Sequence, residues 1–320
     1  MQRLILTIGL ALFFFGIGRA QKIQHLEAFR SINSERYFRF HYDNDFFAAT
    51  DEIYTQGYHF EFVAPVFSKN PLNFMLLKPE GFKTKFGLSL EHIGFTPNHY
   101  ELPEIQYGDR PFASAIMLKS FSVSTHTQQK LRWHSSLSLG LIGPGAFGEE
   151  MQVGIHKWTG NKTPLGWRHQ IKNDVVINYQ VGIEKQVFQF NDILFLQAQS
   201  TLDVGSLFTN ISAGANLVVG QFENVFSSEA KEGRFQIYAY AQPVVTAVGH
   251  DATLQGGLFN TRSPYTISNG NLERFTAQFN FGLVIQTKRL YFEYSRSSIS
   301  KEFETGETAK WGGFRVGYRF

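Results

Sequence analysis

Two features of the sequence could together perform hydrolytic chemistry. The first is the stretch YDNDFFAATDEIYTQG, residues 42–57, which gathers four carboxylates within ten positions. The second is His156, which follows Gln152 by four residues, a spacing that places both side chains on one face of a helix. Histidine is the side chain best suited to proton transfer near neutral pH. The competing interpretation of His156 is an ordinary histidine on the surface of a loop helix.

Other hydrolytic chemistries lack their motifs. The serine-nucleophile pattern G-x-S-x-G and the zinc pattern H-E-x-x-H do not occur, and the chain has no cysteine to act as a thiolate. A glycine-rich turn at residues 143–145 lacks the lysine of a phosphate-binding loop. A hydrolase with this sequence is therefore expected to activate water rather than to form an acyl-enzyme.

The elements that must position these residues are predicted to be β-strands. In residues 274–285 apolar and polar side chains alternate, with Val284 the one exception among the polar positions, and 131–141 alternate in the same way. A period of two places one face of a strand on lipid or core and the other on water. Twelve such segments are predicted: 36–47, 54–66, 82–94, 111–125, 130–142, 173–190, 191–205, 208–221, 234–249, 272–287, 289–299 and 310–320.

Both ends of the chain favour a barrel in the bacterial outer membrane over a soluble β-sandwich. Residues 1–20 carry a basic Arg3, an apolar run and small residues at the end, which is typical of a secretory signal peptide. The last strand ends on Phe320 with aromatic and apolar residues on one face, which resembles the assembly signal of outer-membrane proteins. We therefore predict a signal peptide, 1–20, followed by a single all-β domain, 21–320, that forms a transmembrane antiparallel β-barrel of about twelve strands.

Composition fits this fold class. The 33 Phe and 13 Tyr residues occur without a second long apolar run, and an even strand number suits a single-chain barrel. Removing the signal peptide leaves 28 basic and 27 acidic residues, a net charge of 28 − 27 = +1. So small an excess argues against nucleic acid as a partner.

One segment has helical rather than strand periodicity. Phe147, Met151, Ile155 and Trp158 recur at helical spacing after the Gly-Pro-Gly turn, which predicts a short helix in the loop between strands five and six. Gln152 and His156 are then expected on its other face.

Some residues of the acidic stretch are expected to belong to the candidate site, and others to lie at the solvated rim of the barrel. Residues 38–45 alternate, and Asp45 has the polar parity, which predicts that it points into the barrel lumen. Asn44 needs a bend to join it. Asp51 and Glu52 are predicted to be solvated charges at the rim.

Several spaced motifs resemble the outer-membrane lipid A 3′-O-deacylases, the LpxR-like family. They occur in the family's order over residues 36–180, while the C-terminal half agrees only as barrel strands. The motifs are Asn44-Asp45, Tyr54-Thr55-x-Gly57, Gly108-Asp109-Arg110-Pro111-Phe112-Ala113, Gly140-x-Ile142-Gly143-Pro144, Gln152 with His156, and Trp167-x-x-Gln170.

The resemblance implies a twelve-stranded barrel of the Gram-negative outer membrane, inserted by the barrel assembly machinery, that removes a 3′-linked acyloxyacyl chain from the lipid A of lipopolysaccharide. It implies a calcium-dependent attack of water, with His156 as general base. Asn44, Asp45 and Thr55 would form the polar cluster around the metal or the reacting carbonyl. Physical chemistry agrees, because calcium held by oxygen ligands places positive charge near a developing oxyanion.

Other motif residues are expected to support the site. Asp109 and Arg110 are interpreted as a structural ion pair or turn at the rim, and Gln152 as a neighbour of His156. The family has a basic pair, proposed to meet the substrate, where this chain has Tyr100 and Glu101.

His99 and Arg110 are candidate substitutes for that pair. Two other functions also fit the sequence: a catalytically silent barrel that acts as an adhesin, scaffold or narrow pore, and a phospholipase acting on glycerophospholipids.

Overall fold

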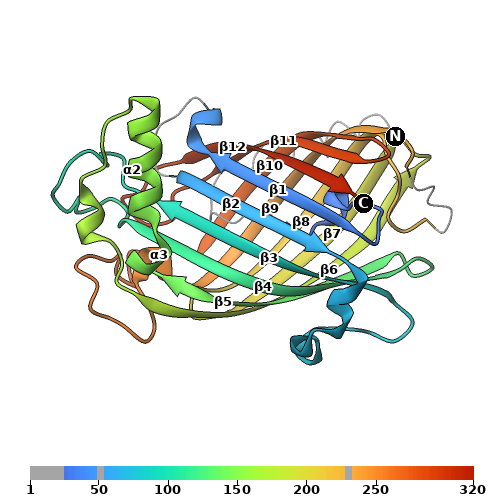
Figure 1. Cartoon of the computed structure of the whole chain (residues 1–320), viewed down its shortest axis with the longest axis horizontal. Coiled ribbons are helices and arrows are strands. Elements are labelled where there is room, and N and C mark those ends of the chain that lie inside the picture. Colours follow the sequence, from blue (N-terminus) through green and yellow to red (C-terminus); the bar gives the residue numbers. More distant parts are fainter. Residues whose placement is uncertain (1–24, 49–53, 228–232) are drawn as a thin grey trace, which may run out of the picture.

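The computed structural model describes residues 25–48, 54–227 and 233–320. The predicted signal peptide, 1–20, and the predicted rim charges Asp51 and Glu52 lie outside these residues. In the described part of the chain, twelve antiparallel strands pair in sequence order and close between the first and the last. Figure 1 shows the resulting barrel with its axis nearly horizontal. A soluble β-sandwich is thereby excluded.

All twelve predicted strands are confirmed, with ends that differ by three residues at most. The strands are β1 (Tyr37–Asn44), β2 (Tyr54–Val63), β3 (Lys83–Phe95), β4 (Ala113–His126), β5 (Leu131–Ile142), β6 (Asp174–Phe190), β7 (Leu194–Gly205), β8 (Phe208–Gln221), β9 (Gln236–Asp251), β10 (Phe275–Gln286), β11 (Leu290–Ile299) and β12 (Ala309–Arg319).

The period of two separates an apolar outer wall from a polar lumen. Leu90, Leu118, Leu139 and Ile177 are register partners on four adjacent strands, and each is 42 to 56% exposed. Residues of the other parity, such as Glu91, line the lumen. This apolar row is what a barrel presents to lipid. None of the helices among the described residues is long and apolar enough to cross a membrane.

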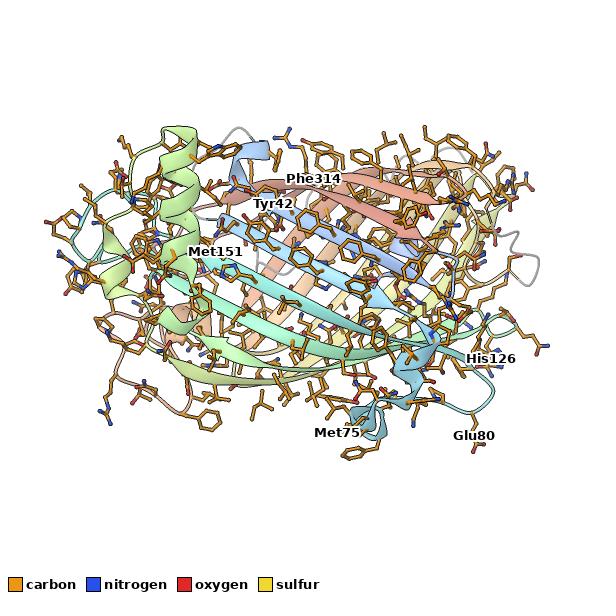
Figure 2. The ribbon with its side chains drawn as sticks, in the orientation of Figure 1. Tyr42, Met75, Glu80, His126, Met151 and Phe314 are labelled. Atoms are coloured by element: carbon orange, nitrogen blue, oxygen red, sulfur yellow. The ribbon has the colours of Figure 1, made fainter. Side chains whose placement is uncertain are left out.

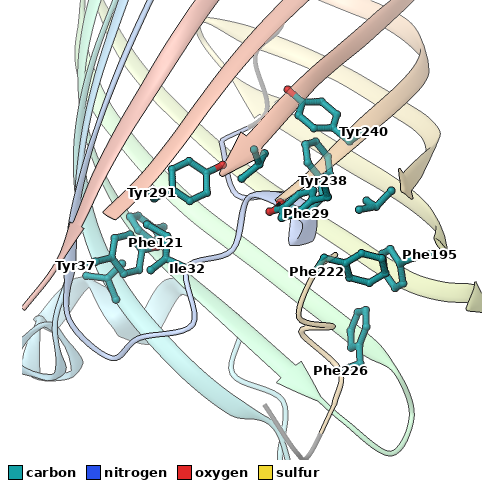
Figure 3. Close-up of a cluster of buried hydrophobic side chains, with 13 residues drawn as sticks. Phe29, Ile32, Tyr37, Phe121, Phe195, Phe222, Phe226, Tyr238, Tyr240 and Tyr291 are labelled. Atoms are coloured by element: carbon teal, nitrogen blue, oxygen red, sulfur yellow. Dashed lines mark hydrogen bonds between the residues drawn. The ribbon is translucent and has the colours of Figure 1, made fainter. Parts of the chain in front are cut away.

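The N-terminal segment 25–34 fills the lumen at the end of the barrel away from α2 (Gly148–Thr159). It includes η1 (Ala28–Arg30), where Arg30 pairs with the carboxylate of Glu293 on β11 at 3.0 Å. The amide of Ala28 donates to Glu184 on β6. Phe29 belongs to the cluster of buried aromatic and aliphatic side chains in Figure 3. We call residues 25–34 the plug.

The two ends of the barrel differ. Figure 1 shows α2 and η2 (Asp45–Ala48) at one end, and β12 running to the other, where the chain ends. Three further short helices lie at the α2 end: η5 (Pro144–Ala146), η6 (Gly166–His169) and α3 (Ala252–Gln255). Long loops mark the extracellular side of outer-membrane barrels, so the α2 end is the extracellular one.

The connection from β2 to β3 leaves the periplasmic end and lies against the outside of the wall. It contains η3 (Pro65–Lys69) and η4 (Pro71–Met75). Figure 2 shows Met75 away from the barrel axis, below the strands.

Candidate functional site

The predicted helix between β5 and β6 is confirmed as α2, and it packs with its polar face inward. Gln152 is 2% exposed and His156 is 7% exposed, whereas Phe147 just before the helix is 56% exposed and Trp158 is 88% exposed. A helix in water would bury the other face. This orientation shows that α2 covers a polar region of the protein.

Glycines fix where α2 meets the barrel. Gly143 has φ +105°, which an L side chain rarely adopts, and it begins the turn through η5 that leads to the helix. A Cβ at Gly148 would lie 2.4 Å from Cβ of Ser114, so the first turn of α2 lies directly against β4. Ser114 has the same parity as Leu118 and therefore faces outward. The first turn of α2 thus lies on the outer side of the barrel wall rather than in the lumen.

His156 is held in one tautomer by the chain that follows the helix. Its Nδ1 lies 2.6 Å from the carbonyl oxygen of Lys162, so Nδ1–H donates and Nε2 carries the lone pair. The ring of Tyr100 meets the imidazole edge-on, with centroids 5.2 Å apart. An oriented histidine with Nε2 as acceptor is the arrangement that a general base needs.

Gln152 ties the helix to the loop beyond it. The indole N–H of Trp167 donates to Oε1 of Gln152 at 2.6 Å, and Trp167 itself is 1% exposed. Phe112 packs on the indole at 5.1 Å between ring centroids. The supporting role predicted for Gln152 and Trp167 agrees with this geometry, because both orient α2.

Asn44 and Asp45 lie where β1 gives way to η2. Asn44 is the last residue of the strand, and Asp45 is the first residue of η2 and 5% exposed. The bend predicted near Asn44 is therefore present. The alternation that predicted a lumen-facing Asp45 ends at Asn44 and does not extend to it. Thr55 lies in β2, next to a bulge between Tyr54 and Gln56, and its side chain lies outside the described part of the structure.

The donor set fits calcium better than a transition metal. Among the described residues no group of three or more His, Cys, Asp or Glu side chains could hold a metal ion. Asn44 supplies an amide oxygen, and Asp45, which is buried, supplies carboxylate oxygens. Calcium accepts carboxylate, carbonyl and water oxygens together, whereas zinc prefers nitrogen and sulfur ligands.

Neighbouring strands of the outer wall connect the Asn44–Asp45 pair to the start of α2. Asp43 pairs with Gly57, Gln56 with Gly94, and Gly94 with Ser114. Asn44 and Ser114 therefore lie on one register row across strands β1 to β4, and Ser114 contacts the start of α2. Figure 2 shows Tyr42, two residues before Asn44 in β1, close to Phe314, and their ring centroids are 5.9 Å apart.

Two residues in this region carry no recognisable motif. His92 on β3 has its Nε2 2.9 Å from the carbonyl oxygen of Ala146, directly before α2, and is 5% exposed. Gln56 on β2 is 1% exposed, and Tyr58 donates to its Oε1 at 3.4 Å. Their outward parity was the one sequence signal that could have identified them.

The predicted departure near Tyr100 and Glu101 has a structural counterpart. Glu101 is ion-paired with Lys162 at 3.1 Å, and Lys162 also supplies the carbonyl that orients His156. The backbone amide of Glu101 and then the Lys162 ammonium hold the pKa of the Glu101 carboxyl below its usual value. Lys162, with a side chain that is 73% exposed, is a cation beside the site that motif reasoning missed.

Arg110 is not available to a substrate. Its guanidinium pairs with Glu302 at 3.1 Å, donates to Thr253 and stacks over Phe95, and the residue is 1% exposed. Asp109 accepts from the backbone amide of Asn98. The structural interpretation of Asp109 and Arg110 agrees with these contacts, and the idea that Arg110 replaces the basic pair is wrong.

A closed barrel with an apolar outer wall and a polar site outside its extracellular end defines a β-barrel protein of the outer membrane. The family model described as outer membrane protein LpxR matches residues 6–320, and the chain belongs to this family. The match includes the C-terminal half, where no motif was recognised.

One solved structure supports the fold. The structure of LpxR from Salmonella typhimurium is 19% identical, with a TM-score of 0.72 over 89% of this chain and 100% of that chain. The β domain of the Bordetella autotransporter BrkA is 9% identical, with a TM-score of 0.44 over 89% of this chain and 98% of that one. No curated protein matches the sequence.

Proposed function

We propose that this protein is a lipid A deacylase of the Gram-negative outer membrane that removes a 3′-linked acyloxyacyl chain by attack of water. The observation that carries the proposal is the buried His156, with Nδ1 bound to the Lys162 carbonyl and the ring of Tyr100 edge-on to the imidazole. Nε2 of His156 takes a proton from the water that attacks the ester carbonyl, and the Lys162 carbonyl stabilises the imidazolium that forms. The imidazolium returns this proton to the sugar oxygen as the ester C–O bond breaks, so the products are a free hydroxyl and a carboxylic acid. Export by signal peptide 1–20 and insertion by the barrel assembly machinery belong to the same proposal.

Helix and wall dimensions support a shared site. His156 stands eight residues after Gly148, or about 12 Å along the helix at 1.5 Å per residue. Asn44 is three strand spacings from Ser114, or about 14 Å at 4.8 Å per strand. Figure 1 shows α2 extending across the strand ends on the side where η2 lies. A helix that starts on β4 can therefore carry His156 to the neighbourhood of Asn44 and Asp45.

Calcium is part of the proposal. Asn44, Asp45 and Thr55 would hold the ion, and bound calcium supplies positive charge near the carbonyl oxygen of the ester. The chain's own residues bind and orient the substrate and move the proton. The position of the site outside the barrel wall favours a substrate that arrives within the membrane rather than through the lumen.

The test is mass spectrometry of lipid A from cells that express the wild type or His156→Ala. We expect the wild type to release a mass equal to one acyloxyacyl unit, and His156→Ala to leave lipid A intact. The control is heat-modifiable mobility in gel electrophoresis, which reports a folded barrel for both proteins. Unchanged lipid A with a folded, inserted wild type would refute the proposal.

The same preparations separate the alternatives. A phospholipase releases fatty acid from vesicles of pure glycerophospholipid, and a silent adhesin or scaffold changes neither lipid. The plug weakens the pore alternative, because its side chains occupy the lumen and are tied to the wall by Arg30 and Glu293. Of these functions, deacylation of lipid A accounts best for a buried, oriented histidine at the extracellular end of the barrel.

A further inference from the structure

Two buried polar atoms in the candidate site have no hydrogen-bond partner among the described residues. They are Nε2 of Gln56, in a residue that is 1% exposed, and Nδ1 of His92, in a residue that is 5% exposed. Buried polar groups in folded proteins are nearly always paired, because an unpaired one forfeits its hydration. Two such atoms on neighbouring strands raise the question of what partner they take.

Gly94 brings the two side chains to one space. Gly94 is the register partner of Gln56 and lies two residues after His92 on the same strand. A Cβ built on Gly94 would lie 3.6 Å from Cγ of Gln56 and 3.9 Å from Cε1 of His92. Both side chains therefore flank the volume above Gly94, which has no side chain of its own to fill it.

The hydrogen-bonding roles of the two atoms are fixed. The Ala146 carbonyl can only accept, so Nε2 of His92 carries the hydrogen and Nδ1 is left as an acceptor. The Gln56 amide nitrogen is a donor, and Tyr58 holds its oxygen. The space above Gly94 is therefore flanked by one donor and one acceptor, both neutral groups.

We propose that Gln56 and His92 bind one hydroxyl group of the substrate, which accepts from Gln56 Nε2 and donates to His92 Nδ1. An ionised phosphate or carboxylate does not satisfy the pair, because it has no hydrogen for Nδ1, and an ester carbonyl fails for the same reason. The proposal rests on the proposed function, since it names a specificity contact of the same site. The hydroxyl can come from a sugar ring or from a hydroxylated acyl chain.

Matched variants of His92 separate binding from structure. His92→Gln places an amide near the Nε2 position, so it can keep the bond to Ala146 while it loses the Nδ1 acceptor. His92→Asn does the reverse. We expect His92→Gln to raise KM about tenfold with little change in kcat, as loss of one hydrogen bond predicts, and His92→Asn to retain more of the affinity. A purely structural His92 would show the opposite order.

Gly94→Ala provides an independent variant. Its methyl group would meet both neighbours at ordinary van der Waals distances, so the barrel is expected to fold with wild-type heat-modifiability. The methyl group would nevertheless occupy the hydroxyl's place. We expect kcat/KM to fall by at least tenfold, and a value equal to that of the wild type would overturn the proposal.

Substrate analogues identify the source of the hydroxyl. One set of analogues lacks the acyl-chain hydroxyl, and another lacks a single ring hydroxyl. We expect the kcat/KM of the wild type to be about tenfold lower on one of these sets than on the full substrate. For His92→Gln, kcat/KM should be the same on that set as on the full substrate. Equal rates on all analogues would mean that water satisfies the pair, and would refute the inference while leaving deacylation intact.

Binding of the same lipids by a His156→Ala background in native mass spectrometry provides a readout that does not depend on hydrolysis. Weaker binding of one analogue supports the hydroxyl contact even if the proposed activity fails. Equal binding of all analogues contradicts it.

A second feature, independent of the site, is the periplasmic connection 65–77, which we call the outer clip. Its polar groups face the wall: Asn70 donates to Ser120, Ser135 accepts from the Leu77 amide, and Ser122 donates to the Leu77 carbonyl. These three serines have the outward parity of the lipid-facing strands but are 0 to 4% exposed. The wall is therefore polar where the clip covers it.

The other face of the outer clip is open and carries three large apolar side chains, with Ser68 and Lys69 exposed between them. Phe74 is 79% exposed, Val66 64% and Met75 43%. A segment in water would bury its large apolar side chains and expose its polar ones, which is the opposite of this arrangement. The lipid-facing row that contains Leu118 lies next to the covered serines, two residues from Ser120 along β4 and on the extracellular side of it. The open face of the clip continues this lipid-facing surface toward the periplasm.

We infer that the outer clip is embedded among the phospholipid acyl chains of the periplasmic leaflet. The absence of cysteine from the chain allows single-site spin labelling. A label at Phe74→Cys in lipid vesicles is expected to be accessible to oxygen and shielded from a water-soluble nickel complex, as at Leu118→Cys. Glu80→Cys, on the same connection and exposed, is the aqueous control. A label at Phe74 as accessible to nickel as the one at Glu80 would contradict the inference.

Discussion

Glu293 on β11 is expected to be the most important single charge for holding the plug in the barrel. Its carboxylate is fully buried and accepts from four groups: Arg30 at 3.0 Å, and Arg315, Tyr240 and Tyr291 at 2.6 Å each. Glu293→Gln keeps the size of the side chain but removes the charge that two buried guanidinium groups share. Removing one partner of a buried ion pair costs about 3 to 5 kcal/mol.

The matched control is Glu273→Gln, whose carboxylate pairs with Lys301 at 2.9 Å on the surface, where the side chains are 35 and 46% exposed. Such a pair contributes at most about 1 kcal/mol. Urea unfolding in lipid vesicles, followed by heat-modifiable mobility, measures both variants. Channel recording in planar bilayers provides a second readout, because a released plug opens the lumen to ions. If Glu293→Gln lost no more stability than Glu273→Gln and stayed closed, the plug would not depend on this carboxylate.

The remaining predictions concern the site. Gln152→Leu leaves the Trp167 indole N–H unpaired and is expected to destabilise the α2 region by about 1 to 3 kcal/mol, with faster proteolysis of the loop and lower deacylation. The double variant Gln152→Leu with Trp167→Phe should lose less stability than the two single variants lose together. Removing calcium with a chelator should abolish ester release and leave the barrel folded, and restored calcium, but not magnesium, should recover it. Because the pKa of Glu101 is depressed in the folded protein, its ion pair with Lys162 stabilises the loop above the ordinary carboxyl pKa and is lost as pH falls through the lowered pKa. Proteolysis of this loop should therefore accelerate in that acidic range. In Glu101→Gln, which lacks the ion pair, proteolysis should be fast at every pH.

Local patterns predicted the barrel wall well. Each strand alternates side chains over ten or more residues in most cases, and the lipid and the lumen select opposite parities. The plug was not predicted, because its polar residues find their partners far along the chain. Arg30 pairs with Glu293, and Ala28 binds Glu184, so nothing within residues 25–34 indicates a position inside the lumen.

The site was predictable where the residues carried a motif or a helical spacing. His156 and Gln152 share the buried face of α2, and Asn44 precedes the bend that the alternation required. Gln56 and His92 were missed, because a polar residue with outward parity looks like any irregularity in a strand until the covering helix is known. The connection through Lys162 was missed for a similar reason, since a backbone carbonyl leaves no mark in the sequence.

The orientation of α2 links the fold to the proposed chemistry. In water, the stripe containing Phe147, Met151, Ile155 and Trp158 would be buried, and Gln152 and His156 would be exposed. The structure reverses this, with Trp158 88% exposed and His156 7% exposed. That reversal is stable where the outer face of the helix meets lipid, because the apolar stripe then gains the contacts that water would deny it. The same membrane that supplies the proposed acylated substrate would therefore hold the proposed general base, His156, in its buried position. Detergent that strips lipid from α2 should lower activity before it unfolds the barrel.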